Sequence, residues 1–323
     1  MISVIVVTYN QERTIGRTLD SILAQRVDED VEIVVGDDCS TDGTEAVCRR
    51  YAAAHPDKIR YIRRERNLGV VRNYFDCIAQ SRGEFLADCA GDDFWVYPDK
   101  LQSQLDVLRA RPEVSMVVTD WVSCDPDGCN VRRNPDQSEV TAVEEYEPGE
   151  LVEPILARRR MLHLCTALYR RAPLERQLAE AHDTFVNPEY TCEDLQITLA
   201  MAAAGRVVML PRVTLHYSVG HDSVSHRHDP GRRFDYSLAT LRQNRALHRH
   251  FGVTPDTADE ASRRLADYMA AMAFQSASPE RRETMRQVLA DHWLPSTPKT
   301  RLYMALSAFP LLWKATLKLK SKF

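Results

Sequence analysis

Strands and helices are predicted to alternate over the first 120 residues, and this alternation restricts the possible folds more than any other feature of the sequence. The β-branched runs at 2–9 and 31–37 are typical of strands that are buried on both faces. Between them, apolar residues recur at helical spacing over 12–25. The cycle continues with helices predicted over 42–55, 69–81 and 98–110, and strands predicted over 59–64, 84–89 and 114–120. The sequence therefore predicts an α/β domain with a mostly parallel sheet.

The remainder of the chain predicts the end of this domain and a helical extension. The turn-rich and acidic stretch 121–160 interrupts the alternation, and a long irregular stretch of this kind is typical of a functional loop. A helix over 193–205 and a strand over 206–211 then continue the α/β pattern. Later segments have helical spacing at 232–250, 257–274 and 279–291. We therefore predict an α/β domain over 1–227 and a helical region over 228–323.

Composition and charge narrow the classes of partner and compartment. The net charge of −4 provides no basic field for phosphate backbones, so no nucleic-acid partner is expected. The eight cysteines form no CxxC pair, which indicates free thiols in a reducing compartment. No basic leader with a long apolar run precedes "MISVIVVTYN", and no run of 18 apolar residues occurs. We expect a cytoplasmic protein, or one on the cytoplasmic face of a membrane.

Polar clusters follow three of the predicted strands, at 8–10, 36–42 and 90–93. In an open parallel sheet, ligands bind beyond the carboxyl ends of the strands, so three clusters at such ends predict one site. Asp42 stands directly before a predicted helix and is interpreted as its cap. Asp38 ends a buried strand with Asp37, where a carboxylate can accept hydrogen bonds from a base or a ribose.

The adjacent carboxylates Asp92 and Asp93 predict a cation site. Neighbouring carboxylates raise one another's pKa unless a cation neutralises them, and Mg²⁺ usually binds one or two carboxylates together with substrate phosphates. The alternative is a solvated turn that leads into the next helix. Phe94 and Trp95 argue against full solvation, so the sequence favours a metal and diphosphate site.

Five motifs in order identify a family resemblance. They are "SVIVVTYNQERTIGRTLDSILAQ", "IVVGDDCSTDGT", "NLGVVRN", "AGDDFWVYPDKL" and "CEDLQITLAMAAAG". Over about residues 1–227 the chain resembles family 2 glycosyltransferases, which have the GT-A fold and invert the configuration at the transferred sugar. The resemblance implies a UDP-sugar or similar donor, a Mg²⁺ or Mn²⁺ cofactor, and a glycan or lipid-linked acceptor in surface polysaccharide synthesis.

The resemblance also implies roles for individual residues. Asp38 resembles the aspartate that reads the base, with Thr8 and Asn10 near the nucleotide. Three residues match a segment that lines the donor site: Asn67, Arg72 and Asn73. Asp92 matches a ribose-binding position and Asp93 a metal-binding position. Asp194 resembles the catalytic base, and the neighbouring Glu193 is a rival for that role or a residue that starts the helix.

Two positions depart from the family pattern. Ala90 stands where an acidic residue is common, so Asp93 would carry the metal with the donor diphosphate and water. In "YSVGHDSVSH", Ser218 replaces an arginine and the histidine is shifted to His221. His221 is predicted either as a metal or diphosphate contact or as an ordinary loop histidine.

Two other functions and the C-terminal tail complete the predictions. A sugar-phosphate nucleotidyltransferase would have a "GGxGTR" loop after the first strand, which is absent, and a non-catalytic scaffold would not need the aspartates. The processive signature "QxxRW" is also absent, so one sugar per encounter is expected. The tail 297–323 carries six basic residues and an apolar face. It is predicted to bind an anionic membrane peripherally, and the alternative is a helix docked on the protein core.

Overall fold

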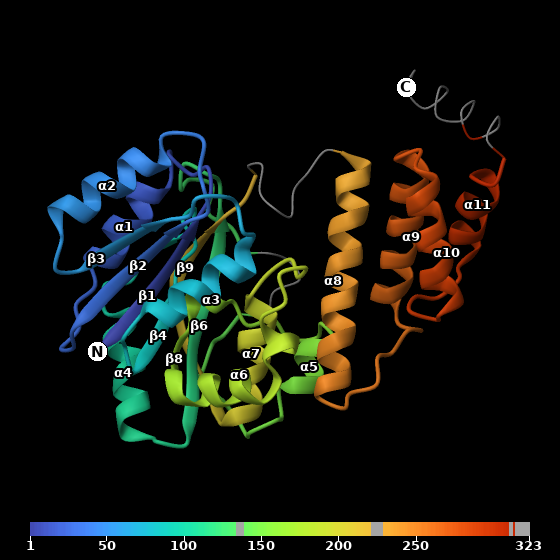
Figure 1. Ribbon diagram of the computed structural model, residues 1–323. Helices are drawn as coiled ribbons and strands as arrows, with labels where there is room; N and C mark the ends of the chain where they lie inside the picture. Colours follow the sequence, from blue (N-terminus) through green and yellow to red (C-terminus); the bar gives the residue numbers. More distant parts are fainter. Residues whose placement is uncertain (134–138, 221–228, 310–312, 314–323) are drawn as a thin grey trace. The chain divides into compact units, whose positions relative to one another are not determined.

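The computed structural model describes residues 1–323 except 134–138, 221–228, 310–312 and 314–323 (Figure 1). The chain divides into two compact units, Met1–His221 and Asp222–Phe323. The first unit ends at His221, which is six residues before the predicted domain boundary at 227. The assignment of donor binding and catalysis to the first unit stays a prediction.

The described strands of the first unit form one sheet with the order β3-β2-β1-β4-β8-β6-β9-β5, and β7 pairs with β9. Parallel pairing joins β3 to β2, β2 to β1, β1 to β4 and β6 to β9, so the predicted mostly parallel sheet is confirmed. The strands are β1 (Ile2–Thr8), β2 (Val31–Asp37), β3 (Ile59–Arg63), β4 (Phe85–Asp88), β5 (Phe94–Trp95), β6 (Val114–Cys124), β7 (Glu144–Tyr146), β8 (Leu168–Arg170) and β9 (Arg206–Ser218).

Both faces of the sheet are buried, which explains the continuous apolar runs of β1 and β2. On one face, Ile2, Val4 and Val6 pack in a cluster with Leu19 of α1 and Leu105 of α4. Helix α3 also contacts β1 and β2. The described helices of this unit are α1 (Ile15–Leu23), α2 (Thr44–Ala54), α3 (Val70–Gln80), α4 (Lys100–Ala110), α5 (Val152–Leu156), α6 (Arg171–Phe185) and α7 (Asp194–Ala204), with a 3₁₀ turn η1 (Leu164–Thr166).

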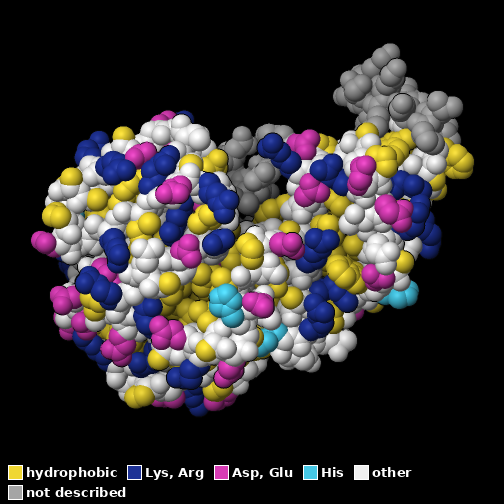
Figure 2. Space-filling view, in the orientation of Figure 1, with side chains coloured by type: hydrophobic (Ala, Val, Ile, Leu, Met, Phe, Trp, Pro, Cys, Tyr) yellow, Lys and Arg dark blue, Asp and Glu magenta, His cyan; other side chains and the backbone are white. Residues whose placement is uncertain are grey.

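The strand predictions missed the antiparallel part of the sheet. β5, β7 and β8 each have two or three residues, too few to show an alternating pattern in the sequence. The predicted loop 121–160 in fact includes the end of β6, β7 and α5. All eight cysteines are free thiols, as expected. Acidic and basic side chains are interspersed on the face shown in Figure 2, and the expectation of no nucleic-acid partner stays a prediction.

The second unit is helical, as predicted. Each helix begins after a side chain that accepts a hydrogen bond from a backbone N–H of its first turn, because Asp, Ser and Thr can satisfy donors that have no partner within the helix. The helices and these capping residues are α8 (Pro230–His250, Asp229), α9 (Glu260–Gln275, Asp259), α10 (Pro279–Ala290, Ser278) and α11 (Pro298–Leu306, Thr297). Phe234, Met269 and Met285 belong to its buried core.

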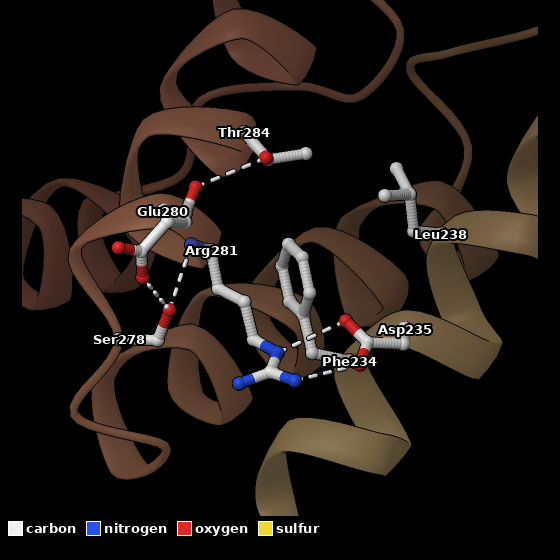
Figure 3. Close-up of a pocket in the computed structure, with 7 residues that line it drawn as sticks. All are labelled: Phe234, Asp235, Leu238, Ser278, Glu280, Arg281 and Thr284. Carbon is white, nitrogen blue, oxygen red and sulfur yellow. Dashed lines mark hydrogen bonds and ion pairs between the residues drawn. The ribbon is translucent and has the colours of Figure 1, made fainter.

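A cavity of about 370 Å³ in the second unit carries none of the residues predicted for catalysis. Figure 3 shows that Arg281 points at Asp235, and its Nε and Nη2 atoms donate to the two carboxylate oxygens at 2.9 and 2.7 Å. Arg281 therefore neutralises Asp235, whereas Glu280 in the same lining accepts from Ser278 Oγ at 2.7 Å. Its lining residues are Phe234, Asp235, Leu238, Ser278, Glu280, Arg281 and Thr284.

The described residues of the tail do not present the single apolar face expected from its sequence. Trp313 is 7% exposed, stacks on Phe274 with ring centroids 6.1 Å apart, and donates from Nε1 to the Phe274 carbonyl oxygen at 2.6 Å. By contrast, Leu302 and Phe309 are 56% and 60% exposed. The burial of Trp313 agrees with the alternative in which the tail docks on the protein core. Leu317, another residue of the predicted apolar face, lies outside the described residues. No described helix combines the length and the apolar character that a membrane span requires.

Candidate active site

The three predicted polar clusters meet at one edge of the sheet. The parallel register places Thr8 of β1 beside Asp37 of β2, and the loop after β4 bonds back to β1. The Asp38 N–H donates to the Thr8 carbonyl oxygen at 3.0 Å, and the Gly91 N–H donates to the Val7 carbonyl oxygen at 3.1 Å. Backbone pairing alone therefore joins the clusters at 8–10, 36–42 and 90–93, as the carboxyl ends of parallel strands require.

Helix α1 holds the loop that carries the paired aspartates. The preceding residue Thr14 and two side chains of α1, spaced to lie on one helical face, each donate to one of three consecutive loop carbonyl oxygens. These hydrogen bonds run from Thr14 Oγ1 to Gly91 at 2.9 Å, from Arg17 Nη2 to Asp92 at 3.4 Å and from Thr18 Oγ1 to Asp93 at 2.6 Å. These hydrogen bonds fix the loop backbone without using the carboxylate oxygens of Asp92 and Asp93.

Asp93 is buried with one oxygen satisfied. The residue is 1% exposed, and its Oδ1 accepts from the Ser218 N–H at 2.9 Å. Its Oδ2 is shut off from solvent and accepts no hydrogen bond of ordinary geometry among the described residues, although the Cys165 thiol lies near enough to lower the pKa of Asp93 against the effect of burial. Burial, and next the negative charge of Asp92, raise the pKa of Asp93 well above its usual range. Such a carboxylate gains most from a cation.

A divalent cation fits this arrangement only with help from the substrate. The described residues contain no group of three Asp, Glu, His or Cys side chains that could hold a metal on its own. The free Oδ2 of Asp93 offers one oxygen ligand, and Mg²⁺ commonly completes its shell with substrate phosphates and water. His221, the other predicted metal ligand, lies outside the described residues.

Asp194 reaches the same region from α7. It is the first residue of that helix, and burial raises its pKa to about 6. Its negative charge in turn raises the pKa of Asp93 and of Asp88, after the larger effect of burial on each. Burial, and then Asp194, raise the pKa of Glu193 well above its usual range. Of the two neighbours, Asp194 is therefore the one that more readily stays ionised near neutral pH.

Asp38 and Asn67, two of the predicted donor-site residues, lie together after β2 and β3. Asp38 is buried, and its two carboxylate oxygens accept from the Leu68 and Gly69 N–H groups at 2.7 and 2.9 Å. Burial raises its pKa. Asn67 Nδ2 donates to the Asp38 carbonyl oxygen at 3.2 Å, so these two residues lie together. Gly69 has φ of +83°, a conformation that glycine adopts without strain.

Thr8 and Asn10 belong to the first cluster, and Asn10 bonds that cluster to the second. Thr8 Oγ1 donates to Gln11 Oε1 at 2.7 Å, and the Asn10 N–H donates to Ser40 Oγ at 2.9 Å. Asn10 is exposed, with φ of +55°, and its Oδ1 accepts from the Thr41 N–H at 2.8 Å. Asp42 does not hold the predicted cap position, because Gly43 directly precedes α2, but its Oδ1 accepts from the Thr44 N–H at 3.0 Å at the start of that helix.

Arg72 and Asn73 occupy different environments on α3. Arg72 is exposed, whereas Asn73 is buried. Asn73 Nδ2 donates to the Gly36 carbonyl oxygen and its Oδ1 accepts from Arg64 Nε, both at 2.8 Å. Its amide is thus used to hold the end of β2, which suits a positioning residue more than a direct donor contact.

Two buried polar groups beneath the site were not predicted. The Tyr74 hydroxyl donates to Asp88 and lies 2.7 Å from the Tyr169 hydroxyl, and burial raises the pKa of Asp88 to about 7. Lys100 donates from Nζ to Gln104 Oε1 at 3.0 Å and lies 4.2 Å from the centroid of the Trp95 ring. The position of Asp88 at the end of an apolar strand was the sequence signal that could have revealed the Tyr74–Asp88–Tyr169 group.

The family is shown by comparison with known proteins. The sequence pattern of the family described as Glycosyl transferase family 2 matches residues 3–178. The chain belongs to glycosyl transferase family 2. The resemblance drawn from the five motifs is thereby confirmed.

Two curated relatives extend the match. An uncharacterised protein of Mycobacterium tuberculosis is 32% identical to the chain over 215 residues, which are 67% of the chain and 58% of that relative. The succinoglycan biosynthesis protein ExoO of Rhizobium meliloti is 26% identical over 277 residues, which are 84% of the chain and 75% of ExoO. The match therefore spans less than two thirds of the mycobacterial relative.

Two solved structures share the fold of the family 2 chain. TarS residues 1–349 of S. aureus, in complex with UDP-GlcNAc, align with a TM-score of 0.61 at 20% identity, over 98% of this chain and 88% of that one. The mannosyltransferase PcManGT of Pyrobaculum calidifontis, in complex with GDP-Man and Mn2+, aligns with a TM-score of 0.51 at 19% identity, over 98% and 86%. The predicted α/β GT-A architecture is confirmed at the level of the fold.

The hydrogen bond from Thr18 to the aspartate loop generates a stability prediction. Thr18→Val keeps the side-chain shape but removes the hydroxyl donor to the Asp93 carbonyl oxygen, leaving the Cys89 thiol at 3.7 Å as a weaker donor. The free energy of unfolding should fall by about 1 to 2 kcal/mol, measured by urea denaturation. Thr284→Val is the matched control, because Thr284 bonds only within the exposed part of α10, and it should change stability by less than about 0.5 kcal/mol. Equal losses in both variants would contradict the role of Thr18.

Proposed function

We propose that this chain transfers a sugar from a nucleoside diphosphate sugar, with UDP as the expected nucleotide, to an acceptor hydroxyl with inversion of configuration. The observation that supports the proposal is the electrostatic effect of the buried Asp194 on Asp93, whose loop lies at the carboxyl edge of the sheet. The fold shared with TarS, solved with UDP-GlcNAc, and with PcManGT, solved with GDP-Man and Mn2+, supports a nucleotide-sugar donor.

Asp194 is the proposed general base. An ionised carboxylate can take the proton of the acceptor hydroxyl as that oxygen attacks the anomeric carbon, while the nucleoside diphosphate leaves from the opposite side of the sugar. A single displacement of this kind inverts the anomeric configuration. The pKa of about 6 keeps most of Asp194 ionised at neutral pH and still makes it a stronger base than an ordinary aspartate.

Asp93 is the proposed ligand of a Mg²⁺ or Mn²⁺ ion, with Asp92 beside it at the ribose. When bound, the cation would neutralise charge on the leaving diphosphate. Asp38 and Asn67 would hold the nucleotide base, with Thr8, Asn10 and the exposed Arg72 at the same side of the site. Because Asp38 already accepts two backbone hydrogen bonds, its carboxylate is fixed in place before any ligand binds.

The name of one relative supports a proposal for the acceptor class. ExoO is named for succinoglycan biosynthesis, so we propose that this chain acts in the synthesis of a surface polysaccharide or lipid-linked glycan. We further propose that the protein works at the cytoplasmic face of a membrane. The exposed Leu302 and Phe309, together with the exposed Lys299 and Arg301, support contact with an anionic lipid surface.

The base assignment predicts the behaviour of Asp194→Asn. Asparagine keeps the size and polarity of the side chain but cannot accept the proton, so sugar transfer should fall by at least about 10²-fold. The affinity for the donor, measured by calorimetry with Mn²⁺, should change by less than about 2-fold. Glu193→Gln is the matched control and should retain most of the transfer rate. A loss of transfer in Glu193→Gln, with full activity in Asp194→Asn, would exchange the two roles.

The same preparation separates the alternative functions. Release of UDP from a UDP-sugar supports a transferase, whereas release of pyrophosphate from a nucleoside triphosphate and a sugar phosphate would identify a nucleotidyltransferase. A folded wild type that binds and converts neither substrate pair would support a non-catalytic scaffold.

The metal assignment predicts the behaviour of Asp93→Asn. Since Asp93 is buried and bonded to the Ser218 N–H, the asparagine variant tests the charge while keeping that hydrogen bond. Stimulation of turnover by Mn²⁺ should be lost, whereas the free energy of unfolding should stay equal or rise because a buried unpaired charge is removed. Asp99→Asn, at an exposed ion pair with Arg26, is the control. Wild-type turnover of Asp93→Asn at saturating Mn²⁺ would overturn the assignment.

The tail surface predicts a membrane phenotype. A Leu302→Glu, Phe309→Glu double variant should reduce the fraction that co-sediments with phosphatidylserine vesicles at low salt by at least about 10-fold, since two exposed apolar side chains and local charge are lost. Val143→Glu is the control, because Val143 is a comparably exposed apolar residue at 55%. Equal co-sedimentation of the wild type and the double variant would remove the membrane from the proposal.

A further inference from the structure

Three aromatic rings from distant parts of the chain form a cluster in the first unit. Trp121 comes from β6, Tyr217 from β9, and His163 from the turn before η1. The ring centroids of Trp121 and His163 are 5.1 Å apart, those of Trp121 and Tyr217 are 5.6 Å apart, and those of His163 and Tyr217 are 4.9 Å apart. The rings meet edge-on or tilted, as aromatic pairs in contact prefer.

The cluster lies beside the carboxylates of the candidate site. Tyr217 directly precedes Ser218, whose N–H donates to Asp93 Oδ1. Two residues after His163, the Cys165 Sγ accepts from the Ala90 N–H at 3.4 Å. After burial, the negative charges of Asp93, Asp92 and Asp194 also raise the pKa of Tyr217. The rings and the acidic groups therefore border the same space.

The three rings differ in exposure. Trp121 is 6% exposed and contacts both other rings, whereas His163 and Tyr217 are both partly exposed. Because the rings of His163 and Tyr217 are inclined at 64° to each other, each partly exposed ring offers its own apolar face at the edge of the site. The C–H face of a pyranose is a ligand surface of matching chemistry, because it is apolar and is bordered by hydroxyl groups that need hydrogen bonds.

His163 adds a hydrogen-bonding group to this surface. Although the residue is partly exposed at its surface, desolvation by the groups packed around the ring lowers its pKa to about 4, against the opposing charge of Asp92, so the imidazole is neutral at physiological pH. Its Nδ1 is shut off from solvent and has no partner among the described residues. A buried N–H without an acceptor is costly, so the single proton of the neutral ring belongs on Nε2. That nitrogen can donate to a hydroxyl oxygen of a ligand.

We propose that His163 and Tyr217, supported by Trp121, form a sugar-binding subsite that selects the pyranose ring at the reaction centre. The ring packs on Tyr217 and His163, and one of its hydroxyl groups accepts a hydrogen bond from His163 Nε2. A neutral imidazole beside Asp92 has no charge with which to attract a diphosphate, so an uncharged sugar is the better ligand. This subsite rests on the proposed glycosyl transfer, and its pyranose belongs to the donor or to the acceptor.

The test separates sugar recognition from nucleotide recognition. The wild type is first titrated, with Mn²⁺, with UDP, UDP-GlcNAc, UDP-glucose, GDP and GDP-mannose. The nucleotide sugar that binds is then compared with its free nucleotide in His163→Phe, which keeps an aromatic ring but has no hydrogen-bond donor. His182→Phe, on an exposed part of α6, is the control.

His163→Phe should bind the free nucleotide as the wild type does. If the sugar is the donor's, its affinity for the nucleotide sugar should fall by about 10-fold, the effect of one good hydrogen bond. If the sugar is the acceptor's, donor affinity should be unchanged and the KM for the acceptor should rise by a similar factor. His163→Gln, whose amide can donate from a similar position, should restore at least part of either loss.

Three outcomes would overturn the proposal. They are equal losses for free nucleotide and nucleotide sugar, unchanged values for donor and acceptor, and losses of the same size in His182→Phe. Should His163→Phe fail to fold, Tyr217→Leu is measured in its place, and unchanged sugar affinity in that variant would count against the subsite. A wild type that binds none of the nucleotides would instead refute the proposed function itself.

Discussion

The hydrogen bonds between α1 and the loop at 91–93 determine where the acidic groups of the candidate site lie. Three carbonyl oxygens in a row are bonded by side chains from one helical face, and Ser218 bonds the same loop from β9. The loop is thus fixed from two sides that are far apart in the sequence. Asp93 can stay buried with an unsatisfied oxygen only because its backbone is fixed in this way, and the cost of that burial is what makes a cation favourable there.

Electrostatics connects the groups that the backbone brings together. Burial raises the pKa of Asp88 to about 7 and that of Asp194 to about 6, and the charge of Asp194 contributes to the shift of Asp88. A cation and a diphosphate at Asp93 would alter this balance, because both change the charge that Asp194 experiences. Donor binding and the readiness of Asp194 to accept a proton are therefore expected to depend on each other.

Local patterns in the sequence predicted the parts of the structure that local physics decides. The β-branched runs give β1 and β2, and Asp42 bonds the start of α2 as its position suggested. The polar clusters after the predicted strands placed Asp38 and Asp93 at one edge of the sheet, whereas the role of Asp194 rests on the family resemblance and stays a prediction. The Tyr74–Asp88–Tyr169 group and the aromatic cluster could not be predicted, because their members come from separate elements that only the tertiary fold joins. Asn73 was found by its motif, but the motif could not reveal that its side chain is buried and bonded to the end of β2.

The replacement of an expected arginine by Ser218 shows how the fold can keep a charge while changing its source. Arg17 of α1 donates from Nη2 to Ser218 Oγ at 3.3 Å and lies 4.1 Å from the centroid of the Phe94 ring. A guanidinium therefore still borders the aspartate loop, although it comes from the opposite end of the domain sequence. The turn at Gly128 packs closely here, because a Cβ at that position would lie 2.8 Å from Arg17 Nη1 and the φ of +83° favours glycine. Arg17, Phe94 and Gly128 thus form one arrangement, in which the small residue at 218 leaves the loop carbonyl of Asp92 within reach of both Ser218 and Arg17.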